Sequence, residues 1–184
     1  MNLNDYLKAR VDPLLHDDFR RIHDSQAAHT GAQACLDRRT HIVLKDNLGG
    51  AVAITPLNRI WIDRRSATID PNWRVVTLAH EARHVLQGGW STSFEREIDA
   101  YCVGAQIVAE LGLNFNYFNF TPSNCNDTFA QLVERVRAVY PPHPLYGANG
   151  PAPLRQKHGL ADILESARQL WLLLIAQRNW SAKL

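Results

Sequence analysis

Two histidines and a glutamate stand at a spacing that can build a metal site. Residues 80–84 read His-Glu-Ala-Arg-His, which is an HExxH pattern. On a helix, His80 and His84 lie one turn apart on one face, so both imidazoles can reach one Zn²⁺ ion at about 2.0 to 2.1 Å. Glu81 is turned about 100° away from His80 and can address a water molecule instead. The pattern therefore predicts a metal site at which Glu81 faces the bound water rather than the metal.

The element that must carry these residues is a helix from Asp70-Pro71 to about Gln87. Asp70 suits the N-cap, Pro71 the first helical position, and Gly88-Gly89 the end. The helix is apolar nearly all round, with Trp73, Val75, Val76, Leu78, Ala79, Ala82, Val85 and Leu86, so we expect it at the centre of the domain. Two core histidines with ordinary partners are the alternative. Burying them with Glu81 costs stability unless each polar atom is satisfied, which a metal ion and its water would achieve.

A third ligand is expected from the next helix, which we predict to be capped by Ser91 or Thr92 and to end at Gly112. Its inward-facing stripe consists of Ala100, Gly104, Ile107 and Leu111, and three residues before Ala100 stands Glu97. The metal should lie level with residue 82 of the first helix. At a rise of about 1.5 Å per residue, the same level on the next, antiparallel helix is near residue 97 or 98. Both considerations favour Glu97.

Two other carboxylates on this helix have alternative roles. Glu95 fits a Thr-x-x-Glu capping box with Thr92. Asp99 would either orient an imidazole by accepting its other N–H or be a solvated helix residue. Gly104 would either permit close approach of the two helices or have no such role.

The arrangement His80-Glu81-x-x-His84 followed by Glu97-x-x-Ala100 resembles the gluzincin type of zinc metallopeptidase, over roughly residues 50 to 112. The resemblance implies a zincin fold, His80, His84 and Glu97 as zinc ligands, Glu81 as general base, and a peptide or protein substrate. Such families often have an aspartate four residues after the ligand glutamate, where this chain has Tyr101. With Glu95 as ligand, Asp99 would hold that place, so both registers stay open.

The resemblance also implies a substrate-binding strand and a group that stabilises the oxyanion. Residues 59–63 or 51–55 could bind a peptide as an added strand, or be ordinary sheet strands. Oxyanion candidates lie late in the chain, and none is preferred: His143, Tyr146, Arg155 and His158. The stretch 114–120, which alternates asparagine with aromatic residues, would line a cleft or, as we prefer, cap the core.

Taken together, the patterns along the whole chain predict one mainly helical α+β domain spanning residues 1–184. A helix begins near Leu3, and a second starts at Asp12-Pro13 and runs towards Thr30-Gly31. Residues 41–44, 51–55 and 59–63 form short β-type runs, which predict a small antiparallel sheet packed on the HExxH helix. Further helices are expected over 127–140 and 160–180, with a Pro/Gly-rich loop over 141–153.

Composition limits the remaining choices. The chain has 184 residues, 46% hydrophobic, with a net charge of +2, which is typical of a globular domain that folds without a structural metal. Nucleic-acid binding has no compositional support, and the longest apolar stretch is too short to span a membrane. The three cysteines, Cys35, Cys102 and Cys125, are odd in number and form no CxxC pair. We therefore predict no disulfide framework, a reducing compartment and a cytoplasmic protein.

Three functions compete on this basis. The first is a zinc-dependent peptidase that hydrolyses peptide bonds. The second is a zincin-like domain that keeps zinc without catalysis and recognises a protein partner. The third is a metal-free helical domain with an accidental HExxH. We favour catalysis over a non-catalytic zinc site because Glu81 is not expected to bind the metal and would be dispensable in a purely structural site.

Overall fold

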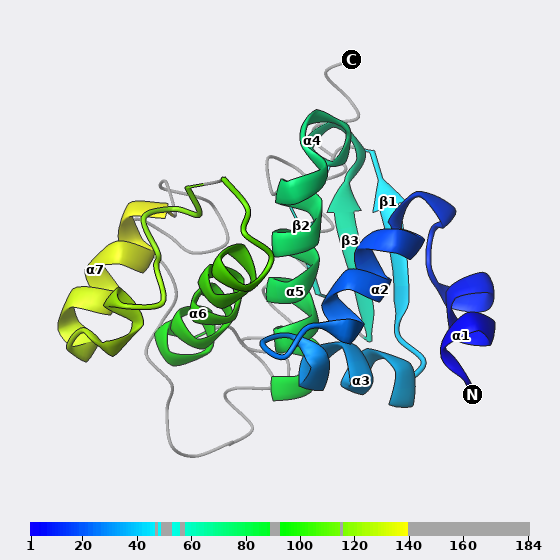
Figure 1. The fold of residues 1–184 in the computed structure, drawn as a ribbon, viewed down its shortest axis with the longest axis horizontal. Coiled ribbons are helices and arrows are strands. Elements are labelled where there is room, and N and C mark those ends of the chain that lie inside the picture. The colour runs from blue at the N-terminus through cyan, green and yellow to red at the C-terminus, as the bar shows by residue number, and fades with distance from the viewer. Residues whose placement is uncertain (47, 49–52, 56–57, 89–92, 115, 140–184) are drawn as a thin grey trace.

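The computed structural model describes residues 1–46, 48, 53–55, 58–88, 93–114 and 116–139. Helices dominate, and a small sheet lies at one side (Figure 1), so the predicted α+β class is confirmed. The elements in chain order are α1 (Leu3–Arg10), the 3-10 turn η1 (Pro13–Leu15), α2 (His16–Asp24), α3 (His29–Asp37), β1 (His41–Lys45), β2 (Ala53–Ile54), β3 (Arg59–Asp63), α4 (Arg64–Ile69), α5 (Pro71–Gln87), α6 (Phe94–Glu110), the 3-10 turn η2 (Asn124–Asn126) and α7 (Phe129–Val139).

The N-terminal helices start as predicted but divide differently. The Asp12 side chain accepts a hydrogen bond from the Leu14 amide, next to Pro13, which confirms the predicted start. The single helix expected up to Thr30-Gly31 is instead two, α2 and α3. Ser25 separates them, because its hydroxyl donates to the Ile22 carbonyl and accepts from the Ala28 amide, ending one helix and capping the approach to the next.

The sheet is mixed, so the predicted antiparallel sheet is wrong. Its strand order is β1-β3-β2. β2 and β3 pair antiparallel, with Ala53 opposite Ile62, whereas β1 and β3 pair parallel, with His41 opposite Arg59. The reason is topological: the chain leaves β1, passes to the far side of β3 to form β2, and only then returns as β3.

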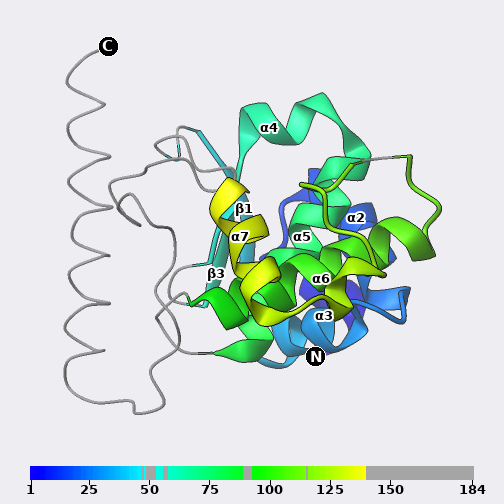
Figure 2. The ribbon, with the colours of Figure 1, turned by 90° about the vertical axis from the view of Figure 1, so that its left-hand side faces the viewer.

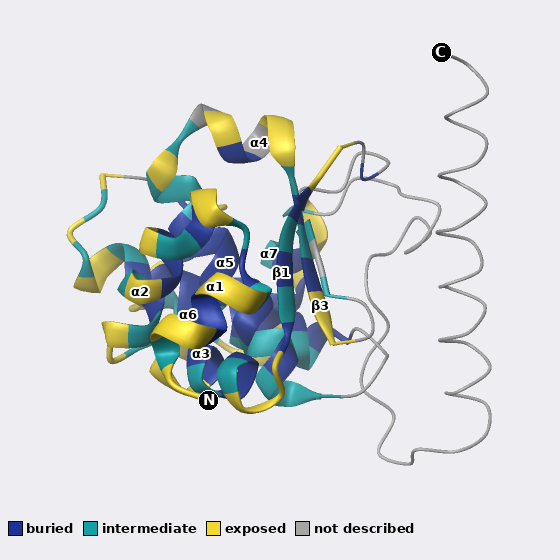
Figure 3. Cartoon of the chain, turned by 90° about the vertical axis from the view of Figure 1, so that its right-hand side faces the viewer, coloured by how far each residue is buried: buried dark blue, intermediate teal, exposed yellow. Residues whose placement is uncertain are grey.

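α5 is the central element. Figure 1 shows it between α6 on one side and α2 with the sheet on the other, and α3 also packs on it. Most of its residues are buried, whereas exposed residues gather on outer elements such as α4 (Figure 3). The predicted ends are confirmed: the Asp70 side chain accepts from the Asn72 amide, and Gly88, with φ of 63°, follows the last residue. Because α5 is buried on every side, packing fixes its position along its axis and its rotation about that axis. The HExxH residues are therefore held in fixed directions.

α6 lies beside α5, and its first residues are held by a cap one or two positions later than predicted. The N-cap is Ser93, whose hydroxyl accepts from the Arg96 amide, rather than Ser91 or Thr92. The capping box predicted for Glu95 involves Thr92, which lies outside the described residues. α6 ends at Glu110, close to the predicted Gly112, which has a positive φ of 60°.

Beyond α6 the chain returns over that helix. Residues 112–123 contain no helix or strand among those described, and α7 confirms the predicted helix within 127–140. Figures 1 and 2 place α7 against α6, away from α5. The loop predicted over 141–153 and the helix predicted over 160–180 lie outside the described residues. Within the part that is described, no helix has both the length and the apolar character needed to cross a membrane.

Candidate metal centre

The structure brings three of the predicted site residues together. His80 and His84 of α5 and Glu97 of α6 each offer a ligand atom, and these atoms all lie within 4.8 Å of one another. The two Nε2 atoms are 3.0 Å apart. Glu97 places Oε2 3.4 Å from the Nε2 of His80 and Oε1 3.5 Å from the Nε2 of His84. Glu97 is 1% exposed, so this carboxylate is fully enclosed.

These separations fit a tetrahedral ion. Ligands at 2.0 to 2.1 Å from a tetrahedral centre are about 3.3 Å from one another. The three observed distances lie on either side of that value. Two imidazole nitrogens that face each other next to a carboxylate also need a proton or a metal ion between them, because otherwise only acceptor atoms would point at one another. The donor set therefore fits a metal ion, and the helix register selects Glu97; Glu95 is outside this group.

The protonation of His84 and that of Glu97 depend on each other. Burial lowers the pKa of His84, but the Glu97 carboxylate outweighs it and raises that pKa to about 9. Burial likewise acts to raise the pKa of Glu97, yet the neighbouring His84 and His80 hold it well below its usual range. At neutral pH the metal-free site thus keeps a proton on His84 beside an ionised Glu97. Because a metal ion must displace that proton, metal affinity falls as the pH falls.

His84 is oriented through Gln87. The Nδ1 of His84 is 2.8 Å from the Oε1 of Gln87, and the amide of Gln87 donates to Asp99 at 2.7 Å and to the Arg96 carbonyl at 3.0 Å. With both amide hydrogens occupied, Gln87 presents its oxygen as an acceptor for the Nδ1–H of His84. This leaves Nε2 unprotonated when a metal is bound.

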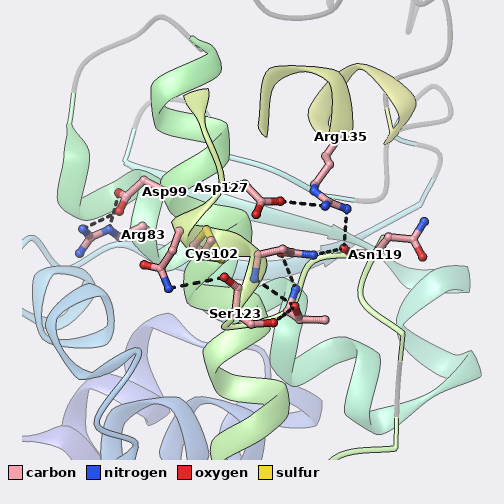
Figure 4. Close-up of a disulfide and its surroundings, with 11 residues drawn as sticks. Arg83, Asp99, Cys102, Asn119, Ser123, Asp127 and Arg135 are labelled. Atoms are coloured by element: carbon pink, nitrogen blue, oxygen red, sulfur yellow. Dashed lines mark hydrogen bonds and ion pairs between the residues drawn. A yellow bond between two sulfur atoms is a disulfide. The ribbon is translucent and has the colours of Figure 1, made fainter. Parts of the chain in front are cut away.

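Asp99 supports the contact between Gln87 and His84 by accepting a hydrogen bond from Gln87. Arg83 donates to it with two bonds of 2.6 and 2.9 Å, and Figure 4 shows this pair. The expectation that Asp99 orients an imidazole directly is replaced by an indirect arrangement, in which Asp99 fixes Gln87 and Gln87 fixes His84. Arg83, a variable position of the HExxH pattern, thereby links α5 to α6.

His80 has a partner that the sequence patterns did not single out. The Tyr117 hydroxyl lies 3.0 Å from the Nδ1 of His80. The available signal was the asparagine and aromatic stretch, and its preferred interpretation as a cap on the core is confirmed for Tyr117 and Phe120, which are both buried. Spacing alone could not show that one of its aromatic residues also reaches a ligand.

Glu81 is outside the group of three candidate ligands. It is buried, and the hydroxyl of Thr55, directly after β2, donates to its Oε2. That bond fixes the carboxylate and leaves Oε1 for another proton. The contact of Thr55 with Glu81 is a second one that the sequence patterns missed, because it depends on how β2 lies against α5.

The cysteine prediction is wrong. Cys102 of α6 and Cys125 of η2 form a disulfide, with Cα atoms 5.7 Å apart (Figure 4). The residues are 23 positions apart and meet because the chain after α6 folds back over that helix. Cys35 is free and buried. The disulfide removes the cysteine-based argument for a reducing compartment.

The predicted oxyanion candidates, His143, Tyr146, Arg155 and His158, all lie outside the described residues. Comparisons with known proteins return no match: no protein-family model, no curated protein and no solved structure is similar to this chain.

Proposed function

We propose that this chain is a zinc-dependent peptidase of the gluzincin type with a zincin-like arrangement of α5 and α6. One observation carries the proposal: two histidines and a buried glutamate converge at distances suited to a tetrahedral ion, while a second buried carboxylate, Glu81, is adjacent but held outside the ligand set. A purely structural site has no need of that second carboxylate.

Zinc is the favoured ion because of the donor chemistry. Imidazole nitrogens bind zinc well, whereas calcium and magnesium prefer sites built only of oxygen ligands. Two histidines and one glutamate make three protein ligands, the number typical of a catalytic zinc site with one position left for water or substrate.

The chemistry follows from the placement of each group. A bound zinc ion supplies Lewis-acid activation of water and of a peptide carbonyl. Glu81 accepts the proton of the attacking water and returns it to the leaving amine. Thr55 holds one oxygen of that carboxylate, so the other is presented in a fixed direction.

The sheet order favours one strand for pairing with a peptide. Of the two candidates, residues 59–63 form β3, which is paired on both sides. β2 stands at the end of the strand order, and Thr55, which contacts Glu81, follows it directly. We therefore infer that an extended substrate pairs with the edge formed by β2.

Peptide cleavage by the purified chain tests the proposal. A library of unstructured peptides is incubated with zinc-loaded protein and with protein stripped by a chelator, and products are identified by mass spectrometry. We expect defined cleavage with zinc, at least about 100-fold less after stripping, and recovery when zinc but not magnesium is returned. Cleavage that is indifferent to stripping would reject the proposal, and zinc binding without any cleavage would favour the non-catalytic recognition domain.

A further inference from the structure

Tyr117 contacts His80 on the side that faces away from the other ligands. Its hydroxyl meets the Nδ1 of His80 at 3.0 Å, while the Nε2 of the same ring faces His84 and Glu97. Tyr117 is 3% exposed and comes from the loop after α6, 37 residues away in sequence. A long-range, buried hydrogen bond to a candidate ligand therefore depends on how this loop is held.

Gly104 makes room for the ring. A Cβ at position 104 would lie 2.2 Å from the Cε1 of Tyr117 and 2.9 Å from two further ring atoms, which no side chain could tolerate. The sequence interpretation offered close approach of two helices as a role for this glycine. The close approach is instead that of an aromatic ring to the backbone of α6.

The loop is also tied to α6 and α7. The disulfide between Cys102 and Cys125 closes a loop that contains Tyr117, and Cys102 lies only two residues before Gly104. Next to Tyr117, the Phe120 amide donates to its carbonyl at 2.8 Å, after two residues of positive φ. Arg135 of α7 forms an ion pair of 2.8 Å with Asp127 at the end of this loop (Figure 4).

We propose that Tyr117 is a positioning residue of the metal centre, and that the Cys102–Cys125 disulfide keeps it in place. The hydroxyl oxygen accepts the Nδ1–H of His80, so the proton stays on Nδ1 and the lone pair of Nε2 points to the ion. Gln87 orients His84 in the same way, because its Oε1 accepts the Nδ1–H of that ring. This inference rests on the metal site of the proposed function and adds a dependence of metal affinity on a loop outside α5 and α6.

The alternative is that Tyr117 only fills the core. Its ring packs with Tyr101, with centroids 5.5 Å apart, and with Phe118 at 5.2 Å, so a packing role is already present. Replacement by phenylalanine separates the two roles, because the ring remains and only the hydroxyl is lost. Tyr6→Phe is a matched control: Tyr6 is fully buried, and its hydroxyl donates at 2.8 Å to the carbonyl of Thr40, the residue before β1.

The test measures affinity for Zn²⁺ and Co²⁺ by competition with a chromophoric chelator, together with the visible spectrum of the cobalt form. Loss of an outer partner of a metal-bound histidine typically lowers affinity about 10 to 100-fold. We expect a loss in that range for Tyr117→Phe, with an altered cobalt spectrum, and a change below about twofold for Tyr6→Phe. Equal affinity and equal spectra in wild type and Tyr117→Phe would overturn the inference.

The disulfide is tested by replacing Cys102 and Cys125 together with serine, alone and combined with Tyr117→Phe. If the disulfide acts through the tyrosine hydroxyl, the cysteine pair lowers metal affinity in the wild-type background and adds little in Tyr117→Phe. Fully additive effects would overturn the link. Should Tyr117→Phe fail to fold in thermal denaturation, the cysteine variant decides alone, and unchanged affinity overturns the inference.

These outcomes differ from failure of the proposed function. Wild-type protein that binds no metal rejects both. Wild-type protein that binds metal but cleaves no peptide rejects only catalysis, because the readout for Tyr117 is affinity and spectrum rather than activity.

Discussion

Replacing Glu81 by glutamine is expected to abolish peptide hydrolysis while zinc stays bound. The amide has nearly the same shape as the carboxylate and can still accept a hydrogen bond from Thr55, so the packing around α5 should persist. It has no basic oxygen to take a proton from water. A positioned general base contributes about 10² to 10⁴-fold to the rate, so a loss of at least that size is expected in kcat.

Glu95→Gln is the matched control for this experiment. It makes the same chemical change at a glutamate that lies near the site in sequence but outside the ligand group. Its hydrolysis rate should stay close to that of the wild type. Retained hydrolysis in Glu81→Gln at unchanged zinc content would show that Glu81 is not the base.

Glu97→Gln is expected to remove most of the metal affinity, and hydrolysis with it. The change deletes the only anionic ligand among the three and the charge that raises the pKa of His84. Because loss of even an outer partner costs about 10 to 100-fold in affinity, we expect loss of this ligand to exceed about 100-fold. Equilibrium dialysis with zinc, at fixed pH, measures it.

The same pair of variants decides the register of the third ligand. Glu95→Gln should bind zinc as wild type does. If Glu95→Gln lost the ion and Glu97→Gln kept it, the alternative register, with Asp99 four residues after the ligand, would be correct. The burial of Glu97, at 1% exposure between two imidazoles, favours the first outcome.

Much of the site could be predicted because it depends on helical periodicity. The limits of α5 follow from local signals at Asp70, Pro71 and Gly88, and the four-residue spacing of His80 and His84 is a property of any helix. Glu97 was selected by the inward stripe of α6 although the cap was placed early, since periodicity does not depend on where the helix starts.

The features that were predicted wrongly or missed all depend on contacts between residues that are far apart in the sequence. Nothing local in residues 41–63 states that β2 should lie on the far side of β3 and leave β1 parallel to it. The disulfide and the Tyr117 contact both require that the chain after α6 fold back, and Cys102 and Cys125 carry no spacing signal for this. Gly104 was noticed as unusual, but its partner could only be identified in space.

In the proposed site, His80, His84 and Glu97 bind one ion together. Anomalous X-ray scattering at the zinc edge from crystals of the zinc-loaded protein measures this directly. We expect one anomalous peak about 2.0 to 2.2 Å from the two Nε2 atoms and from a carboxylate oxygen of Glu97. A zinc peak elsewhere, with these three side chains unligated, would show that they do not form the metal site.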